Sequence, residues 1–176
     1  AGDRCLAPGF IDAHTHSDFS LPRFPRAESR ISQGVTTEVG GNCGFSPFPV
    51  EPSRLDLLRD SSSFIAATLS WDWRTAADFF RHLESKPVSL NHIPLVAHGA
   101  VRVAVIGFDR RPPTDAEMER MKALVAEAME AGAAGLSSGL AYAPGIFSGP
   151  AEMIELCRVV ARFGGVYAPH MRDQDA

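Results

Sequence analysis

Short apolar runs alternate with longer amphipathic stretches along the chain, and this alternation predicts strands that are each followed by a helix. Runs rich in β-branched and other apolar residues, bounded by Gly or Pro, are typical of buried strands. Such runs occur near Phe10 and Ile11, at 35–39, at 93–97, at 133–137 and from Val166 to His170. The stretches between them are long enough for helices, so the chain is expected to repeat a β/α unit.

Helices are predicted from their caps and from the spacing of their apolar residues. The clearest one begins after Thr114, where Glu117 completes a capping box, and Gly132 ends it. The other predicted helices lie at 27–33, at 54–59, after the cap Thr75, and at 150–163. Residues 45–75 are rich in Pro, Ser and Asp, and they predict a long connection with little regular structure apart from the short helix within it.

Polar residues with catalytic or metal-binding chemistry follow the predicted strands. They are His14, His16, Cys43, His98, Ser137, Ser138 and His170. A parallel α/β sheet is implied by strands that alternate with helices. A barrel of eight β/α units builds its active site from many strand ends, whereas a doubly wound sheet usually places its site at one crossover. The distribution therefore favours a (β/α)8 TIM-type barrel.

Five β/α units are too few to close such a barrel. We therefore expect the chain to be a portion of a longer protein. On this interpretation residues 1–8 are the end of a β segment that leads into the barrel. Residues 9–176 are the truncated N-terminal part of the catalytic barrel, about its first five units.

Composition and charge exclude several classes of protein. The chain has 176 residues, of which 45% are hydrophobic and 22% charged, as in a globular protein with a substantial core. Its formal net charge of −4 provides no basic surface for nucleic acid or anionic lipid. No apolar run approaches the roughly 20 residues of a membrane span, and the first residues lack a secretory pattern. Three unevenly spaced cysteines indicate a reducing compartment, so a cytoplasmic location is expected.

The pair His14 and His16 is the first candidate for metal binding. Side chains two residues apart on an extended strand point the same way, about 6–7 Å apart along the chain. Two imidazoles at a strand end would supply half of a metal site, because neutral imidazole is a common ligand for zinc and similar ions. A bare His-x-His also occurs by chance on exposed loops, so the pair needs support from other residues.

Cys43 and His170 are two further candidate metal ligands, and this role is favoured over a purely structural one. Cys43 lies in a Gly-Gly-Asn-Cys-Gly turn, where the glycines suggest close backbone approach, and His170 stands at a strand end. For His98 two interpretations stay open: a metal ligand, or a residue that only forms hydrogen bonds within a loop. His82 and His92 are expected to face solvent.

A second motif points to a different chemistry. Gly135-Leu136-Ser137-Ser138-Gly139 matches the Gly-x-Ser-x-Gly nucleophile elbow of serine hydrolases. That elbow needs a helix directly after the serine, whereas here the next predicted helix starts only at Pro150. The match also leaves the histidines and Cys43 unexplained, so a serine hydrolase is disfavoured.

Several segments together resemble the amidohydrolase superfamily, and more narrowly its D-aminoacylase (N-acyl-D-amino-acid deacylase) branch. His-x-His is shared across the superfamily, and the Asn-Cys-Gly and His-Met-Arg-Asp segments are the specific part. The segments are Pro8 to His16, Gln33 to Thr37, Gly41 to Gly44, Gly135 to Gly145 and Tyr167 to Asp173. Many relatives that act on cyclic amides bridge two metals with a carbamylated lysine. Lys86 and Lys122 both lie away from strand ends, which leaves the Cys43 thiolate as the strong ligand.

The resemblance implies a zinc-dependent hydrolase that cleaves N-acyl-D-amino acids to a carboxylate and a D-amino acid. It implies one tight zinc held by Cys43, His170 and a later histidine, with His14 and His16 at a second, weaker metal position. Tyr142 would bind the substrate carboxylate, and an aspartate beyond Ala176 would be the general acid/base. The isolated segment would then be inactive, with the remainder of the barrel as its partner. The alternatives are another amidohydrolase, acting on cyclic amides or D-peptides, and a non-catalytic metal-binding fragment.

Overall fold

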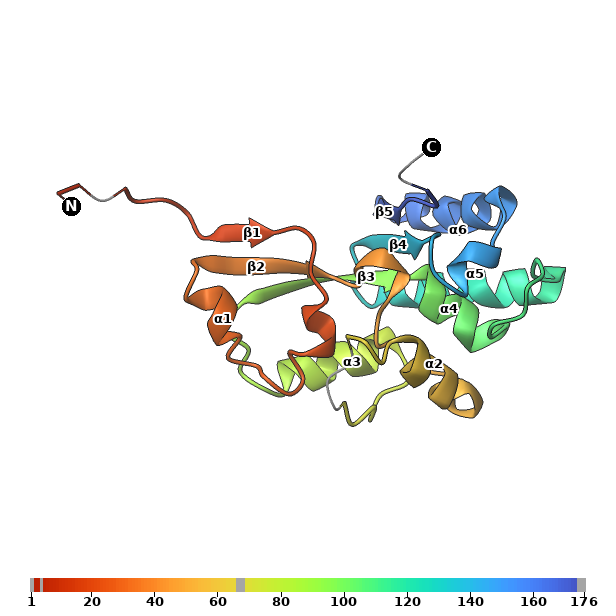
Figure 1. Ribbon diagram of the computed structural model, residues 1–176, viewed down its shortest axis with the longest axis horizontal. Helices are drawn as coiled ribbons and strands as arrows, with labels where there is room; N and C mark the ends of the chain where they lie inside the picture. The colour runs from red at the N-terminus through yellow and green to blue at the C-terminus, as the bar shows by residue number, and fades with distance from the viewer. Residues whose placement is uncertain (1, 4, 66–68, 174–176) are drawn as a thin grey trace.

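A computed structural model describes residues 2–3, 5–65 and 69–173 of the chain. Five parallel strands form one sheet in the order in which they occur along the chain (Figure 1). The strands are β1 (Phe10–Asp12), β2 (Val35–Gly40), β3 (Asn91–Ala97), β4 (Gly135–Gly139) and β5 (Val166–His170). Sequential parallel strands joined by helices are the expected arrangement for part of a (β/α)8 barrel.

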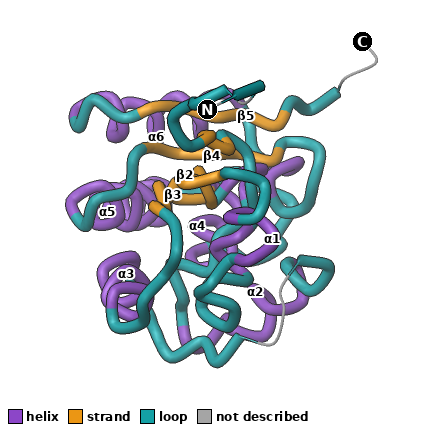
Figure 2. The backbone as a smooth tube through the Cα atoms, turned by 90° about the vertical axis from the view of Figure 1, so that its left-hand side faces the viewer, coloured by secondary structure: helices purple, strands orange, loops and turns teal. Residues whose placement is uncertain are grey.

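Helices connect consecutive strands. They are α1 (Glu28–Ile31), α2 (Leu55–Ser61), α3 (Ala76–Glu84), α4 (His98–Val105), α5 (Asp115–Glu130) and α6 (Pro150–Arg162). Four 3-10 turns lie between them: η1 (Ser17–Phe19), η2 (Asn42–Gly44), η3 (Pro52–Arg54) and η4 (Gly145–Phe147). In Figure 2, α6, α5 and α3 follow one another down one side of the strands, starting from β5 at the top. These three helices thus cover one face of the sheet.

The predicted caps are present in the structure. Thr75 accepts a hydrogen bond from the amide of Asp78, whose side chain accepts one in return, and Thr114 and Glu117 form the same capping box at α5. Such caps satisfy amides that the first turn of a helix leaves without partners. The short helix predicted at 54–59 is found as α2.

One helix was not predicted. The strand predicted at 93–97 continues directly into α4, which starts at His98 and whose buried residues include Val101 and Val103. A glycine at position 99 and the β-branched valines lower the helix propensity of this segment. Its helical form depends on packing, because the apolar side chains fill the core beneath β4 and α5.

The long segment 45–75 carries much of the core despite its irregular backbone. The Trp73 indole donates a hydrogen bond to the Pro47 carbonyl at 2.7 Å, and its ring packs against Phe79 of α3 at 5.1 Å. Phe48 also lies against Phe79, with ring centroids 5.3 Å apart. These aromatic residues of the segment therefore pack against α3.

The two edge strands depart from the prediction of a buried first strand. Phe10 and Ile11 are 60% and 68% exposed, and Val166 and Tyr167 on β5 are also exposed. Each edge strand pairs with one neighbour only, so side chains there lack a second packing partner. The predicted boundary at residue 8 stays a prediction, and residues 1, 4 and 174–176 lie outside the described part.

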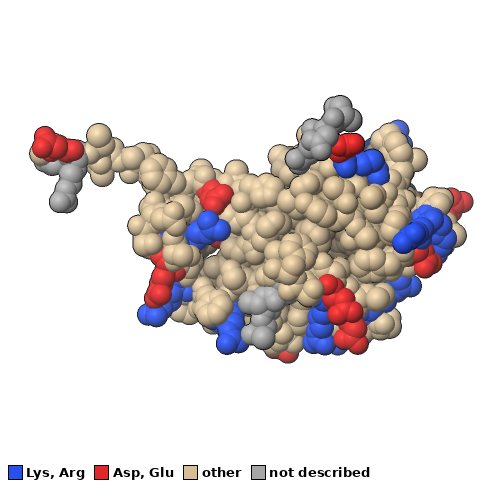
Figure 3. Space-filling model, in the orientation of Figure 1, with Lys and Arg blue, Asp and Glu red and all other residues tan. Residues whose placement is uncertain are grey.

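Surface charge and hydropathy give two further observations. On the face shown in Figure 3, acidic and basic side chains are interspersed along the lower and right-hand edges. None of the described helices is long and apolar enough to cross a membrane.

Candidate metal centre

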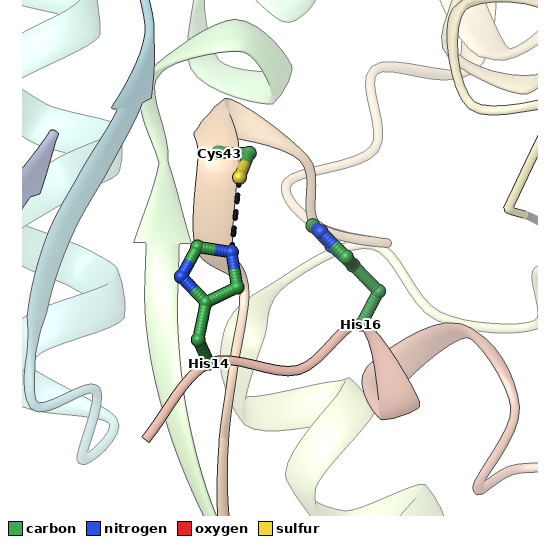
Figure 4. A group of neighbouring side chains, drawn as sticks. All are labelled: His14, His16 and Cys43. Carbon is green, nitrogen blue, oxygen red and sulfur yellow. Dashed lines mark hydrogen bonds between the residues drawn. The ribbon is translucent and has the colours of Figure 1, made fainter. Parts of the chain in front are cut away.

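Three predicted ligands meet at the carboxyl ends of β1 and β2. One ligand atom from each of His14, His16 and Cys43 lies within 4.8 Å of the other two (Figure 4). His14 Nε2 is 3.2 Å from Cys43 Sγ, and the two imidazole rings stand nearly perpendicular, with centroids 5.8 Å apart. Among the described residues this is the one group of three or more His, Cys, Asp or Glu side chains with such spacing.

The two histidines converge for a different reason from the one predicted. Strand β1 ends at Asp12, so His14 and His16 lie in the turn after it and not on an extended strand. The residue between them fixes this turn. Thr15 donates from its amide to Val39 O at 2.9 Å and from its hydroxyl to the same oxygen at 3.1 Å. This buried contact with β2 directs both imidazoles toward Cys43.

The turn that carries Cys43 is docked on the end of β4. Cys43 has φ +55°, between Gly41 and Gly44, which also have positive φ. The Gly44 amide donates to Ser137 Oγ at 3.1 Å, and that hydroxyl donates to Gly41 O. Gly139 allows the close approach, because a side chain there would overlap the Cys43 carbonyl. Two strands far apart in sequence therefore position the thiol.

The electrostatics of the group suit a cation. Burial and then the neighbouring His14 lower the pKa of His16, which favours the neutral imidazole that metals bind. Burial raises the pKa of the Cys43 thiol, so a bound cation is needed to favour the thiolate. His16 Nδ1 is buried without a hydrogen-bond partner. Two nitrogen donors and one sulfur donor fit zinc, which takes such mixed ligands in tetrahedral sites.

His170 lies near this group but outside it. It ends β5, opposite Gly139 of β4. Its Nε2 is 3.2 Å from the Tyr142 hydroxyl, and the two rings pack with centroids 4.7 Å apart. The structure thus brings the predicted fourth ligand together with the predicted substrate-binding residue. Its role as a ligand stays a prediction.

His98 has other partners. It is fully buried, and its Nε2 is 2.7 Å from Glu152 Oε1. Arg102 Nη1 donates to both oxygens of the same carboxylate, at 2.8 and 2.6 Å. His98 therefore belongs to a buried ionic cluster between α4 and α6.

The other two histidines were wrongly expected to face solvent. His92 lies on β3, where burial lowers its pKa to about 4. His82 is half-buried and packs on Trp73, with ring centroids 5.0 Å apart. The expectation for His92 failed because β3 starts at Asn91, two residues before the predicted strand, and includes His92.

The serine elbow is excluded by its surroundings. Ser137 is fully buried and its hydroxyl is engaged by the Gly41 and Gly44 backbone. Ser138 Oγ is 2.7 Å from the Tyr167 hydroxyl. After β4 the chain forms a turn and not a helix, as the sequence indicated.

Comparison with known proteins identifies the family. The model of the Amidohydrolase family matches residues 1–163. The chain belongs to this family. An N-acyl-D-aspartate deacylase of Alcaligenes xylosoxydans xylosoxydans is 43% identical over 174 residues, which cover 96% of this chain and 34% of that protein.

Solved structures of amidohydrolases agree with this assignment. A D-aminoacylase crystal structure superposes with a TM-score of 0.83 at 40% identity, covering 94% of this chain and 34% of that one. An N-acyl-D-glutamate deacylase from Bordetella bronchiseptica, complexed with zinc and a phosphonate inhibitor, has a TM-score of 0.81 at 35% identity, with the same coverage. The chain spans about a third of the length of these relatives. The predicted D-aminoacylase branch and the portion of a TIM-type barrel are confirmed.

One aromatic residue beside Tyr142 was missed by sequence reasoning. Phe45 packs against Tyr142 and the exposed Phe64, with ring centroids 5.6 and 5.1 Å apart. Phe45 is two residues from Cys43, and that proximity in sequence was the available signal. Asp18, two residues after His16, is fully buried, and burial raises the pKa of its carboxyl to about 7.

Proposed function

We propose that the protein of which this chain forms a part is a zinc-dependent deacylase, hydrolysing N-acyl-D-amino acids to a carboxylate and a D-amino acid. The observation that carries this proposal is the convergence of His14, His16 and Cys43 at the strand ends. Relatives named as deacylases of N-acyl-D-amino acids support the choice of substrate.

In this proposal, Cys43 and His170 are the ligands of the tight zinc, together with a histidine outside the chain. His14 and His16 form the second, weaker position. The short distance from His14 Nε2 to Cys43 Sγ supports a thiolate that faces both positions. Zinc, when bound, supplies Lewis-acid polarisation of the acyl carbonyl and an activated water.

The remaining roles belong to residues at the rim. The Tyr142 hydroxyl donates a hydrogen bond to the substrate carboxylate and fixes the orientation of the D-amino acid. Phe45 packs against the Tyr142 ring and shields this contact from water. A general acid/base aspartate is expected in the part of the protein beyond Ala176.

Removing the thiol tests the metal ligand. Cys43→Ala in the full-length enzyme should lose most of its bound zinc. Its kcat/KM should fall by more than about 100-fold, because even residues that only orient a ligand cost 10–100-fold. Zinc is measured by elemental analysis of the purified protein. Cys157→Ala is the matched control, since Cys157 lies on α6 and is no part of the group.

The substrate is tested with the same preparations. Paired N-acetyl-D- and N-acetyl-L-amino acids should show hydrolysis of the D form only. Stoichiometric zinc in Cys43→Ala would remove Cys43 from the site. Faster turnover of cyclic amides or D-peptides would favour a different amidohydrolase activity, and zinc binding without any turnover would favour a purely metal-binding role.

A further inference from the structure

The loop 140–149 joins β4 to α6 and carries Tyr142. Its first residues are fixed to β4, because the Tyr142 amide donates to Gly139 O at 3.2 Å. Gly145 also packs on Gly139, because a side chain at position 145 would overlap the Gly139 carbonyl. The start of the loop is thus held by the strand end that also supports the Cys43 turn.

The end of the loop is held by the buried ionic cluster. Glu152 lies in the first turn of α6, directly after the loop, and it binds both His98 and Arg102. Arg102 also donates to the carbonyls of Asp109 and Arg111, at 3.1 and 2.6 Å. The Glu152 carboxylate is bound on both oxygens, which compensates for its burial. This cluster fixes the start of α6 independently of the metal site.

Two carbonyls in the middle of the loop are bound by Arg172, a side chain at the surface. Arg172 Nη1 donates to Ile146 O at 2.8 Å and Nη2 to Ser148 O at 2.9 Å. A planar guanidinium suits such a pair of carbonyls, which a lysine could not bind in the same way. Arg172 lies two residues after His170, so it links the end of β5 to this loop.

The contact of Arg172 is relayed to Tyr142 through one hydrogen bond. The Ile146 amide donates to the Tyr142 carbonyl at 2.8 Å, while the Ile146 carbonyl accepts from Arg172. The Tyr142 hydroxyl in turn lies 3.2 Å from His170 Nε2. His170, Arg172, Ile146 and Tyr142 therefore form a closed ring of contacts.

We propose that Arg172 is a positioning residue, which braces the loop 140–149 and thereby holds the Tyr142 hydroxyl beside His170. This inference rests on the proposed function in one respect, namely that Tyr142 binds the substrate carboxylate. The brace itself follows from the contacts of Arg172 alone. Both ends of the loop have other anchors, and Arg110 stacks on Phe147 in its middle. Loss of Arg172 therefore loosens the backbone around Ile146 and Ser148 without unfolding the protein.

The test uses Arg172→Ala in the full-length, zinc-loaded enzyme. Hydrogen exchange of amides in 140–149 should become about tenfold faster, since two charge-assisted hydrogen bonds are lost. KM for an N-acetyl-D-amino acid should rise about tenfold, with kcat changed less than about threefold, because the lost contact acts in binding. Zinc content should not change. The exchange rate and KM of Arg172→Lys should lie between those of Arg172→Ala and those of the native protein.

Arg158→Ala is the matched control, because Arg158 is an exposed arginine of α6 that pairs with Glu155 and not with the loop. Unchanged exchange in 140–149 after Arg172→Ala would overturn the brace. A raised KM with unchanged exchange would mean that Arg172 contacts the substrate itself, which also overturns it. If the native enzyme hydrolyses no N-acyl-D-amino acid, the proposed function fails, and the exchange measurement still decides the brace.

Discussion

Cys43 adopts a left-handed backbone conformation that an L-residue with a side chain rarely occupies. Its φ of +55° costs about 1–3 kcal/mol where a glycine would be unstrained. Glycines stand at neighbouring positions 41 and 44, so the turn could readily accommodate another one. A strained cysteine in this place is explained by the thiol, which only this residue supplies to the group with His14 and His16.

Tyr142 provides the sharpest test at the residue scale. If its hydroxyl binds the substrate carboxylate, Tyr142→Phe should cost about 1–3 kcal/mol in kcat/KM, the range for a hydrogen bond to a charged group. The loss should appear with free-carboxylate substrates and be absent with amide-capped analogues. Tyr167→Phe is the control, because the Tyr167 hydroxyl pairs with Ser138. Equal losses on both kinds of substrate would show that Tyr142 shapes the pocket without binding the carboxylate.

At the scale of elements, the sequence predicted those helices whose start depends on residues close together in the chain. The capping boxes at Thr75 and Thr114 set helix starts that the structure reproduces, because both partners lie within three residues of each other. Helix α4 escaped prediction because its stability comes from core contacts with distant elements. The partner of His98 escaped for the same reason, since Glu152 is 54 residues away in the sequence. Ligand types could thus be predicted, but the contacts that position them could not.

The docking of the turn η2 on β4 predicts a sensitive position at Gly139. Gly139→Ala would push the added methyl group into the Cys43 carbonyl, which is backbone and cannot move aside cheaply. We expect a loss of roughly 1–3 kcal/mol in the free energy of unfolding, as for overpacked sites. Zinc affinity should also weaken, because the displaced turn carries the thiol.

Denaturant unfolding and competition with a zinc chelator measure these two effects of Gly139→Ala. Gly149→Ala is the control, since nothing lies within 4 Å of the Cβ it would add. Native zinc affinity in Gly139→Ala would show that the close approach to β4 does not position Cys43.

At the scale of the whole molecule, the exposed strands at both edges mark the sheet as open. Phe10 and Ile11 on β1 and Val166 on β5 have apolar side chains that a closed barrel would cover. The sequence predicted these strands to be buried because their residues are apolar. Such residues would be buried in a complete barrel, where each edge strand has a second neighbour. We still expect residues 1–176 in isolation to be inactive as a deacylase, because the open sheet lacks the remaining strands of the barrel.

His92 gives a prediction about the pH dependence of the folded chain. It is the β3 partner of Glu38 in the parallel ladder, and neither of its ring nitrogens has a hydrogen-bond partner. Burial lowers its pKa from 6.5 to about 4, so the folded state favours the neutral ring. The resulting stability is fully present above pH 6.5 and is lost as the pH falls through 4. The loss amounts to about 3 kcal/mol.

Unfolding of the metal-free protein at several pH values measures this effect, with His92→Asn as the variant. Asn does not titrate, so the variant should lose less stability than the native protein between pH 7 and pH 4. Asp18 contributes with the opposite sign, because burial raises its pKa to about 7. Asp18 lies beside His92, because both side chains approach Gly40, so the comparison is made in an Asp18→Asn background to separate the two contributions. His82→Asn is the control, with a smaller effect expected from a half-buried ring. Parallel pH profiles for His92→Asn and the native protein would mean that His92 is protonated in the folded state without penalty.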